Sequence, residues 1–403
     1  MERSALDDYR TSFVANSIVI PSLGDKPIST PTEVQGNTPS PKSTERLRFW
    51  LLLGGLITLL PISVTLGVSL GSVDIPIGVV WWIAASETIN IFSDITSFEL
   101  NRWADIEENW TKAQFNIIWL IRFPRVLMGF FVGAGLAVVG ATMQALVRNP
   151  LADPYILGIS SGASVGAVTV LAFGAFAFAG IYAISVGAFF GAILTFLTVF
   201  LLARSNGRLH PARLILAGVA VAYFFSGFTS FIILTSDNRE LARTVLAWLL
   251  GSLAGTNWSE LTLPAAALFF GSVYLVLQAR GLNALIVGDE TAATLGVDLT
   301  RFRCSLFLVV SLVTGVMVAV SGAIGFVGLM IPHIVRLMVG TDHRRVMPVS
   351  IFAGSIFLIL FDVVARIAFN PVELPVGVIT SLLGGPFFLW LLHRQMKNLR
   401  SMQ

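Results

Sequence analysis

Cysteine is almost absent: Cys304 is the only one among the 403 residues. A single cysteine excludes an intrachain disulfide and a metal site built from several thiolates. The histidines are equally uninformative, because they are scattered and lack metal-ligand spacing: His210, His333, His343 and His393. We therefore predict no metal site, and we expect Cys304 to be an ordinary buried residue.

Charge is also scarce. Charged residues make up 12% of the chain, whereas 55% of the residues are hydrophobic. A soluble globular protein carries about 25% charged residues, so this composition excludes that class. The net charge is only +3, and the arginines between the apolar runs indicate membrane orientation rather than nucleic-acid binding. We predict an all-α polytopic membrane protein.

The chain also lacks a nucleotide-binding loop. None of its four lysines follows a glycine, so the motif GxxxxGK[ST] does not occur. No grouping of nucleophile, acid and base predicts an enzyme. If ATP drives transport, the ATPase must be a separate chain. No removable signal peptide is predicted either, because residues 1–20 contain Asp7 and Asp8 and no apolar core behind a basic start.

The apolar runs predict ten membrane spans. Residues 1–46 are expected to be a disordered cytoplasmic tail, since residues 21–41 are rich in Pro, Ser and Thr. The membrane domain then covers residues 47–403. Its predicted spans are residues 49–70, 126–147, 156–178, 182–203, 214–235, 261–277, two within 304–335, 349–369 and 376–392.

Arginines between the runs predict the orientation of these spans. They put both termini and residues 278–303 in the cytoplasm, and they leave residues 71–118 as an external loop lying at the membrane interface. The run 304–335 has to cross twice, so we expect it to break near Ser321 and Gly322. Residues 237–255 predict a short helix at the outer surface, because their apolar residues recur at helical spacing.

Glycines four residues apart predict close helix contacts without identifying any particular interface. The pairs are Gly129 and Gly133, Gly162 and Gly166, Gly187 and Gly191, and Gly251 and Gly255.

The most informative stretch is residues 122–154. Arg122 and Arg125 precede 22 uncharged residues that end at Arg148, a length of about 33 Å in a helix and enough to cross the hydrocarbon core. Pro150 and Pro154 then end the helix. The pattern predicts fixed positive charge at the outer face and an irregular segment at the inner face.

Within the spans, the main carboxylate is Asp362, four residues before Arg366. That spacing places both on one helical face and favours a local ion pair over proton coupling. An ion-coupled secondary transporter is therefore an alternative with little support, and a receptor or scaffold without transport is another. Residues 288–296 begin with acidic residues and end in glycine, a pattern that predicts a short exposed helix suited to a partner's groove.

Several blocks between residues 48 and 395 together resemble the iron-siderophore, haem and cobalamin permeases of binding-protein-dependent ABC importers. They include IRFPRVLMGFFVGAGLAVVGATMQALVRNPLADP, GDETAATLGV, GAIGFVGLMIPHIVRLMVGTDHRRVMP, DVVARIA and ELPVGVITSLLGGPFFLWLL. The resemblance implies a type II ABC importer permease with about ten transmembrane helices in a bacterial plasma (inner) membrane. It also implies no cofactor in this chain, since ATP and magnesium belong to the partner ATPase.

The same resemblance implies partners and site residues. The partners are a second permease subunit, two ATP-binding subunits, an extracytoplasmic substrate-binding protein and the lipid bilayer. The residues expected to dock the binding protein are Arg122, Arg125 and Arg366. A cytoplasmic gate is expected at Asn149, Leu151, His210 and Pro211, and ATPase coupling at Asp289, Glu290, Ala292, Leu295 and Gly296. The expected substrate is a bulky metal chelate, first a ferric siderophore, with haem or cobalamin as alternatives.

Overall fold

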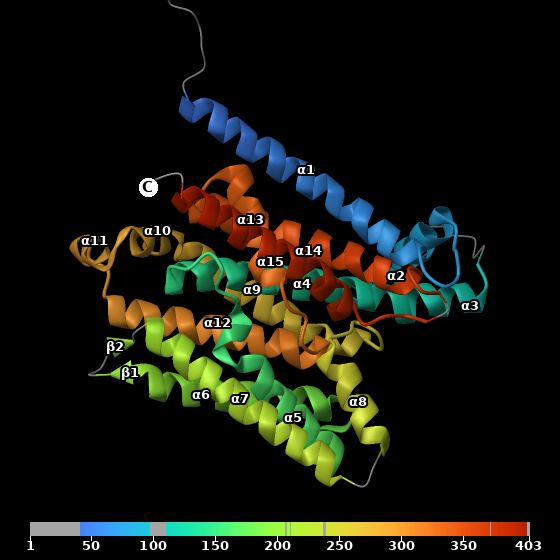
Figure 1. Cartoon of the computed structure of the whole chain (residues 1–403). Helices are drawn as coiled ribbons and strands as arrows, with labels where there is room; N and C mark the ends of the chain where they lie inside the picture. Colours follow the sequence, from blue (N-terminus) through green and yellow to red (C-terminus); the bar gives the residue numbers. More distant parts are fainter. Residues whose placement is uncertain are drawn as a thin grey trace, which may run out of the picture. The chain divides into compact units, whose positions relative to one another are not determined.

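The computed structural model describes residues 41–96, 110–205, 208–209, 211–236, 239–370 and 372–400. Contacts within the chain separate Met1–Ser43 from Thr44–Gln403, and the following description concerns the second unit. Its described residues are almost entirely helical (Figure 1). Within these described ranges, eight helices are long and apolar enough to span a membrane. The predicted all-α polytopic membrane fold is confirmed.

Each predicted span corresponds to a helix. Eight are long, and α5 and α13 are shorter apolar helices. The helices are α1 (Pro41–Ser69), α4 (Phe123–Val147), α5 (Ile159–Phe173), α6 (Ala183–Ala203), α7 (Pro211–Thr235), α9 (Thr262–Leu277), α12 (Leu299–Ser321), α13 (Val327–Val339), α14 (His343–Ile367) and α15 (Val376–Arg400). The break between α12 and α13 begins at Gly322, where φ is +67°, as the sequence predicted.

Helix α4 forms the centre of the bundle (Figure 1). Twenty of its 25 residues are buried, and it packs against α14, α12, α13 and α9. Two glycines permit this close packing, because a Cβ at Gly133 or Gly140 would overlap the backbone of the facing helix. A helix with so little lipid-facing surface is fixed by its neighbours on nearly all sides.

The helical segment that contains α4 begins earlier than predicted. Helix α3 (Lys112–Phe115) and a π-helix (Asn116–Arg122) lead directly into α4, so a helical segment of 36 residues runs from Lys112 to Val147. At 1.5 Å per residue it is about 54 Å long, well beyond the hydrocarbon thickness of about 30 Å. Arg122 and Arg125 therefore lie inside a helical segment rather than at its beginning.

Two of the glycine pairs face each other where α5 meets α6. A Cβ at Gly162 or Gly166 would overlap the backbone of Gly191 or Gly187. This is the close approach that small residues allow in lipid. The pair Gly251 and Gly255 does not follow this pattern, since both residues lie in a turn after α8 (Arg239–Leu249) with φ of +70° and +80°.

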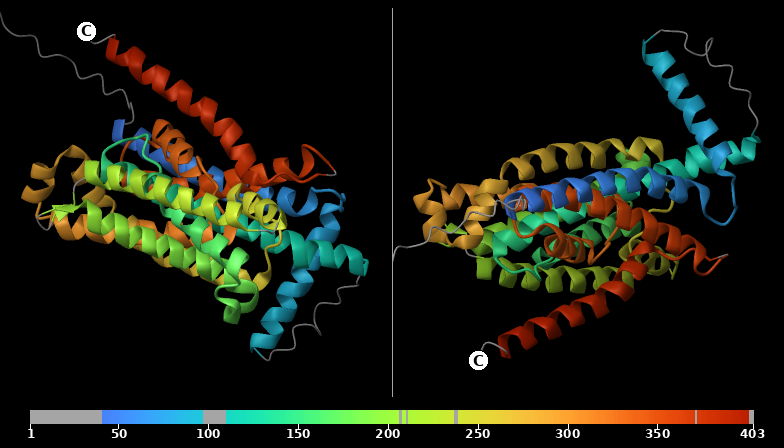
Figure 2. Two further views of the ribbon diagram at one scale, coloured as in Figure 1. Left: turned by 60° about the horizontal axis from the view of Figure 1, so that its bottom comes forward. Right: turned by 90° about the horizontal axis from the view of Figure 1, so that it is seen from above.

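The elements divide between the two ends of the bundle (Figures 1 and 2). One end, called here the α11 end, carries α10 (Ala279–Val287), α11 (Asp289–Thr294) and the hairpin of β1 (Arg204–Ser205) and β2 (Arg208–Leu209), with the beginning of α1 and the end of α15. The opposite α2 end carries α2 (Ile77–Thr96), α3 and α8. The segments predicted to be cytoplasmic thus share one end.

The predicted external loop contains more structure than expected. Helix α2 is an apolar helix with Trp81 and Trp82 exposed, and the last residues of the loop already belong to the helical segment leading into α4. The short helix predicted within residues 237–255 is present as α8, where Leu241 and Val245 are buried against α5 and α7. Shorter helical turns are Pro154–Leu157, Ala177–Tyr182 and Trp258–Glu260.

Candidate functional site

At the α2 end of the bundle, the buried side chain of Arg122 lies against the carboxyl end of α1. The last carbonyl groups of a helix have no intrahelical partner and need donors from elsewhere. Nη1 of Arg122 donates to the carbonyl oxygens of Val68, at 2.9 Å, and Ser69, at 2.7 Å. Its Nη2 donates to the carbonyl oxygen of Val73 at 2.5 Å. A positive group at this position also interacts favourably with the helix dipole.

Arg366 completes the cap from α14. Its Nη2 donates to the carbonyl oxygen of Gly67 at 2.7 Å and its Nη1 to that of Leu70 at 3.0 Å. The amide of Leu70 makes the last helical bond, to Leu66. The four carbonyl groups that remain, at residues 67–70, are therefore all satisfied by two arginines.

Arg125 joins the same cluster through two carboxylates. Its Nε and Nη2 donate to Asp362 at 3.0 to 3.1 Å, and its Nη1 donates to Glu373 at 2.7 Å. Asp362 also pairs with Nε of Arg366 at 3.2 Å, so the local ion pair predicted from the sequence is confirmed. A carboxylate that is 2% exposed is thereby compensated by two guanidinium groups, as a buried charge requires.

The three arginines expected to dock a binding protein are thus brought together by the helical segment Lys112–Val147 and by α14, but they are buried. Arg122, Arg125 and Arg366 are 5%, 5% and 3% exposed, and all three guanidinium groups are engaged within the chain. The side chain of Glu373 is 40% exposed. The docking role stays a prediction. Neither the carbonyl partners nor Glu373 could be predicted from the sequence, because none is linked to its arginine by a short spacing.

At the other end, α10 and α11 form the segment predicted to couple to the ATPase. Ala292 is fully buried, whereas Leu295 is 69% exposed. Helix α11 ends in a Schellman motif, in which the amide of Val297 donates to Ala292 and the amide of Gly296 to Ala293. Gly296 has φ of +84°, which favours glycine at this position. Ala293 and Leu295 are exposed, so both remain open to a partner's groove, whereas Ala292 packs within the chain.

The predicted coupling segment is bonded to the end of α4 by an arginine that the sequence analysis did not assign to the site. Arg148 follows α4 in the left-handed conformation with φ of 55°. Its Nε donates to the carbonyl oxygen of Leu285 in α10 at 2.8 Å, and its guanidinium pairs with Asp289 at the start of α11. Arg303 of α12 pairs with the same carboxylate at 2.8 Å.

The predicted gate follows directly after Arg148. The side-chain oxygen of Asn149 accepts a hydrogen bond from the amide of Leu151 at 2.9 Å, which closes a tight turn. Leu151 packs against a small apolar cluster from α13 and α15 made of Leu329, Met330 and Leu391. His210 lies outside the described residues, and Pro211 begins α7. Within the described residues, no three His, Cys, Asp or Glu side chains form a group suited to a metal ion.

Comparisons with known proteins agree with this architecture. The model of the FecCD transport family matches residues 59–394. The chain is 45% identical over 276 residues to a cobalamin import system permease protein of Halobacterium salinarum, covering 68% of this chain and 73% of that protein. It is 44% identical over 282 residues to a hemin transport system permease protein of Yersinia pestis, covering 69% and 84%.

A longer match, 39% identical over 354 residues, is to an uncharacterized ABC transporter permease of Bacillus subtilis, covering 85% of this chain and 93% of that protein. Among solved structures, one described as an inward-facing metal-chelate type ABC transporter matches with a TM-score of 0.69 and 30% identity. That match covers 85% of this chain and 98% of the other.

Proposed function

The chain belongs to the FecCD transport family of ABC importer permeases, and we propose that it carries a bulky metal chelate inward across the plasma membrane. The observation that carries this proposal is the family match over residues 59–394. Two separate sites, at the two ends of one buried helix, are in keeping with such a role. ATP hydrolysis is assigned to separate subunits, because this chain has no phosphate-binding loop.

The proposed mechanism is alternating access. A loaded binding protein docks at the α2 end near the cluster of Arg122, Arg125 and Arg366, where opposite charges set its register. ATP-driven closure of the ATPase subunits then displaces α10 and α11 at the other end. Arg148 passes that displacement to the turn at Asn149 and Leu151, which opens inward. Arg125 and Arg148 are 23 residues apart along α4, a distance of about 35 Å.

The exposed apolar side chains of α11 and its neighbours support an ATPase partner. Val287, the last residue of α10, is 73% exposed, and Leu295, directly after α11, is 69% exposed. In water these side chains remain costly to leave uncovered. A groove on the ATPase that receives a short helix would cover them.

A second permease subunit, either the same chain or a related one, is proposed to enclose the pathway. Helix α15 supports this, because one of its faces packs against α13 and α14 while the other is exposed. Its exposed side chains include Leu382, Leu389 and Trp390. A second subunit packed against this helix would give it the neighbours that it lacks within one chain.

The substrate class rests on the family. A ferric siderophore is the first choice from the sequence, whereas the relatives with a named cargo are described as permeases for cobalamin and hemin. All three are bulky metal chelates. No polar or charged constellation in the described residues selects among them, so the experiment has to include each one.

The test is uptake into proteoliposomes that contain this chain, its ATPase and its binding protein. Radiolabelled ferric siderophore, hemin and cobalamin are supplied outside, with ATP enclosed. We expect ATP-dependent accumulation of one chelate, and no accumulation when the ATPase carries a substitution of its phosphate-binding lysine. Accumulation driven by an ion gradient without the ATPase would assign the chain to secondary transport. Failure of all three chelates, with the ATPase active, would contradict the substrate class.

A further inference from the structure

A proline inside α13 removes one of the hydrogen-bond donors of that helix. Pro332 lies four residues after Gly328. In an α-helix, the carbonyl oxygen of one residue accepts a hydrogen bond from the amide four residues later, and proline has no amide hydrogen. The carbonyl oxygen of Gly328 therefore lacks its regular donor. Because Gly328 is buried, this acceptor needs a partner from another element.

Gln144 of α4 supplies that partner. Its Nε2 donates to the carbonyl oxygens of Gly328 and Leu329, both at 3.3 Å. Its Oε1 accepts a hydrogen bond from Nη2 of Arg336, two turns further along α13, at 2.5 Å. Gln144 is 4% exposed, and both ends of its amide are engaged by one neighbouring helix.

Arg336 depends on the same amide. It is half-buried, and within the described residues Gln144 is the hydrogen-bond acceptor that its guanidinium group reaches. Both side chains border a cavity of about 300 Å³ at the α11 end. A guanidinium group only donates hydrogen bonds and a carbonyl oxygen only accepts them. Together these partners therefore hold the amide of Gln144 in a single orientation.

The turn of α13 that Gln144 holds belongs to the predicted gate. Leu329 is part of the apolar cluster against which Leu151 packs. Gly140 allows this turn to lie directly on α4, because a Cβ at Gly140 would overlap the backbone of Gly328. Gln144 follows Gly140 by one turn on the same face of α4. Among the described residues, the hydrogen bonds between α4 and α13 are those of Gln144.

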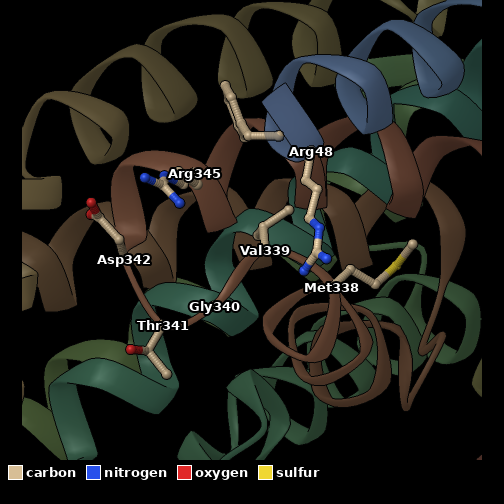
Figure 3. A pocket seen from close by; sticks show the side chains of 8 residues that line it. Arg48, Met338, Val339, Gly340, Thr341, Asp342 and Arg345 are labelled. Carbon is tan, nitrogen blue, oxygen red and sulfur yellow. The ribbon is translucent and has the colours of Figure 1, made fainter. Parts of the chain in front are cut away.

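The carboxyl end of α13 is fixed separately, by the coupling segment. The turn from Met338 to Asp342 borders a cavity and leads into α14 (Figure 3). Asp342 accepts a hydrogen bond from Nδ2 of Asn283 in α10 at 2.6 Å, and the amide of His343 donates to Oδ1 of Asn283 at 2.9 Å. Without Gln144, apolar packing alone would hold the beginning of α13 against α4, while its far end stayed bonded to α10.

We propose that Gln144 is a positioning residue of the inner gate. Its amide, oriented by Arg336, fixes the beginning of α13 to α4 and thereby places Leu329 against Leu151. The inference rests on the proposed transport function, because the gate belongs to alternating access. Since α4 is buried on nearly all sides, it supports the α13 side of the gate, and the turn at Asn149 closes against a fixed surface. When the bonds of Gln144 are lost, a displacement of α10 shifts α13 as well, and the gate opens more often.

The test is the rate at which a cysteine at the gate reacts with a maleimide, in the complex of this chain with its ATPase in lipid nanodiscs. The parent carries Cys304→Ala, which removes the native cysteine, and Leu329→Cys at a position that is 4% exposed. A buried thiol reacts when its surroundings open, so the rate follows the population of the open gate. We expect Gln144→Leu to raise this rate about tenfold, which corresponds to about 1.4 kcal/mol.

A local effect is separated from a general loss of stability by two controls. Thr142 is a buried residue of α4 whose hydroxyl donates to the carbonyl oxygen of Val138 in the same helix at 2.9 Å, so Thr142→Val should leave the rate unchanged. The second control replaces Leu329→Cys by Val245→Cys, at a fully buried position of α8 at the opposite end. The rate at that cysteine should not respond to Gln144→Leu.

Conservative variants separate the two contacts of Gln144. Gln144→Glu keeps an acceptor for Arg336 but places a carboxylate oxygen against two carbonyl oxygens, so it should react as fast as Gln144→Leu. Arg336→Lys keeps a donor for the amide and should react more slowly than Arg336→Met. A role in stability alone, in which any lost polar contact acts alike, predicts no such order.

Two results would overturn the proposal. The first is equal reaction of Leu329→Cys in the Gln144→Leu and Thr142→Val variants. The second is an equal increase at Leu329→Cys and Val245→Cys, which would mean that the substitution loosens the whole subunit. The proposed transport function is checked separately, by ATP-dependent uptake through the wild-type chain. Uptake by the wild type together with an unchanged rate in Gln144→Leu contradicts the role of Gln144 and leaves the transport function standing.

Discussion

Arg122→Ala tests whether the buried arginines hold α1 in place. In the wild type, Arg122 satisfies three carbonyl groups, those of Val68, Ser69 and Val73. Residues Val68 and Ser69 are 0% and 5% exposed, whereas Val73 is 49% exposed and open to water. The substitution therefore leaves two buried acceptors without donors. At about 1 to 3 kcal/mol for each, the free energy of unfolding should fall by roughly 2 to 6 kcal/mol.

The assay is the free energy of unfolding measured in mild detergent, by steric trapping or by a denaturant series. Arg122→Lys should lose less stability than Arg122→Ala, because an ammonium group can still donate to one or two carbonyl groups. The matched control is Arg301→Ala, whose exposed side chain pairs with Asp298 one turn away. That control should change the stability by no more than about 0.5 kcal/mol.

The same measurement separates the structural role from docking. If Arg122→Ala is as stable as the wild type but binds the binding protein more weakly, Arg122 does not stabilise the end of α1 and the docking prediction is supported. Reversal of Arg122, Arg125 and Arg366 to Glu is expected to weaken association with the binding protein and to leave the ATPase attached. The burial of these residues adds a requirement, because three glutamates near Asp362 would also destabilise the fold. The stability of that variant must therefore be measured first.

Three further predictions concern single side chains. Glu373→Gln weakens the interaction of a half-exposed carboxylate with Arg125, so it should raise the affinity for an acidic docking surface several-fold, measured by titration with the binding protein. Ala292→Pro removes a buried amide that donates to the carbonyl oxygen of residue 288 at 3.0 Å, and it should leave ATP hydrolysis active while uptake is lost. Asp289→Asn weakens the pair with Arg148 and should lower uptake per ATP hydrolysed by a few-fold, as expected for the loss of about 1 kcal/mol at a half-exposed pair.

Two exposed sites serve as comparisons for these predictions. Glu240→Gln, on α8 at the same end as Glu373, should leave the affinity for the binding protein unchanged, and equal effects of the two substitutions would contradict a local role for Glu373. Thr294→Ala, at an exposed position of α11, should transport normally. Full uptake by Ala292→Pro would remove α11 from the coupling pathway. If Asp289→Asn keeps the wild-type ratio of uptake to ATP hydrolysis, the ion pair between Asp289 and Arg148 does not couple hydrolysis to transport.

The spans were predictable because a membrane imposes a simple rule on sequence. The apolar runs between arginine clusters predicted all ten helices. Because residues 304–335 have to cross the membrane twice, the break near Gly322 was predicted as well. The helical extension before Arg122 was missed because the preceding residues were grouped by their charges into one loop. Helix α2 was missed for the same reason, since Glu87 interrupts its apolar pattern.

The site was predictable only as a set of residues. Arg122 and Arg125 stand out as charges beside a long apolar run, and the usual expectation for such residues is that they reach toward water. Their partners lie about 50 residues earlier and about 240 residues later in the chain, and no sequence period links them. Arg148 was recognised only as the end of a span, because its bonds to Leu285 and Asp289 depend on how α10 packs against α4.

Helix α4 is a rigid connection between the two sites at its ends. Arg125 is bonded to the loop before α15, and Arg148 is bonded to α10 and α11. Between them the helix is buried on nearly all sides, so bending it would disturb the packing of α12, α13 and α14 together. A displacement at α11 is therefore expected to move the turn at Asn149 and Leu151 relative to α13 and α15 rather than to deform α4. On this reasoning α4 is the fixed reference of the subunit, and the apolar contact of Leu151 with Leu329, Met330 and Leu391 is the part that has to separate when the gate opens.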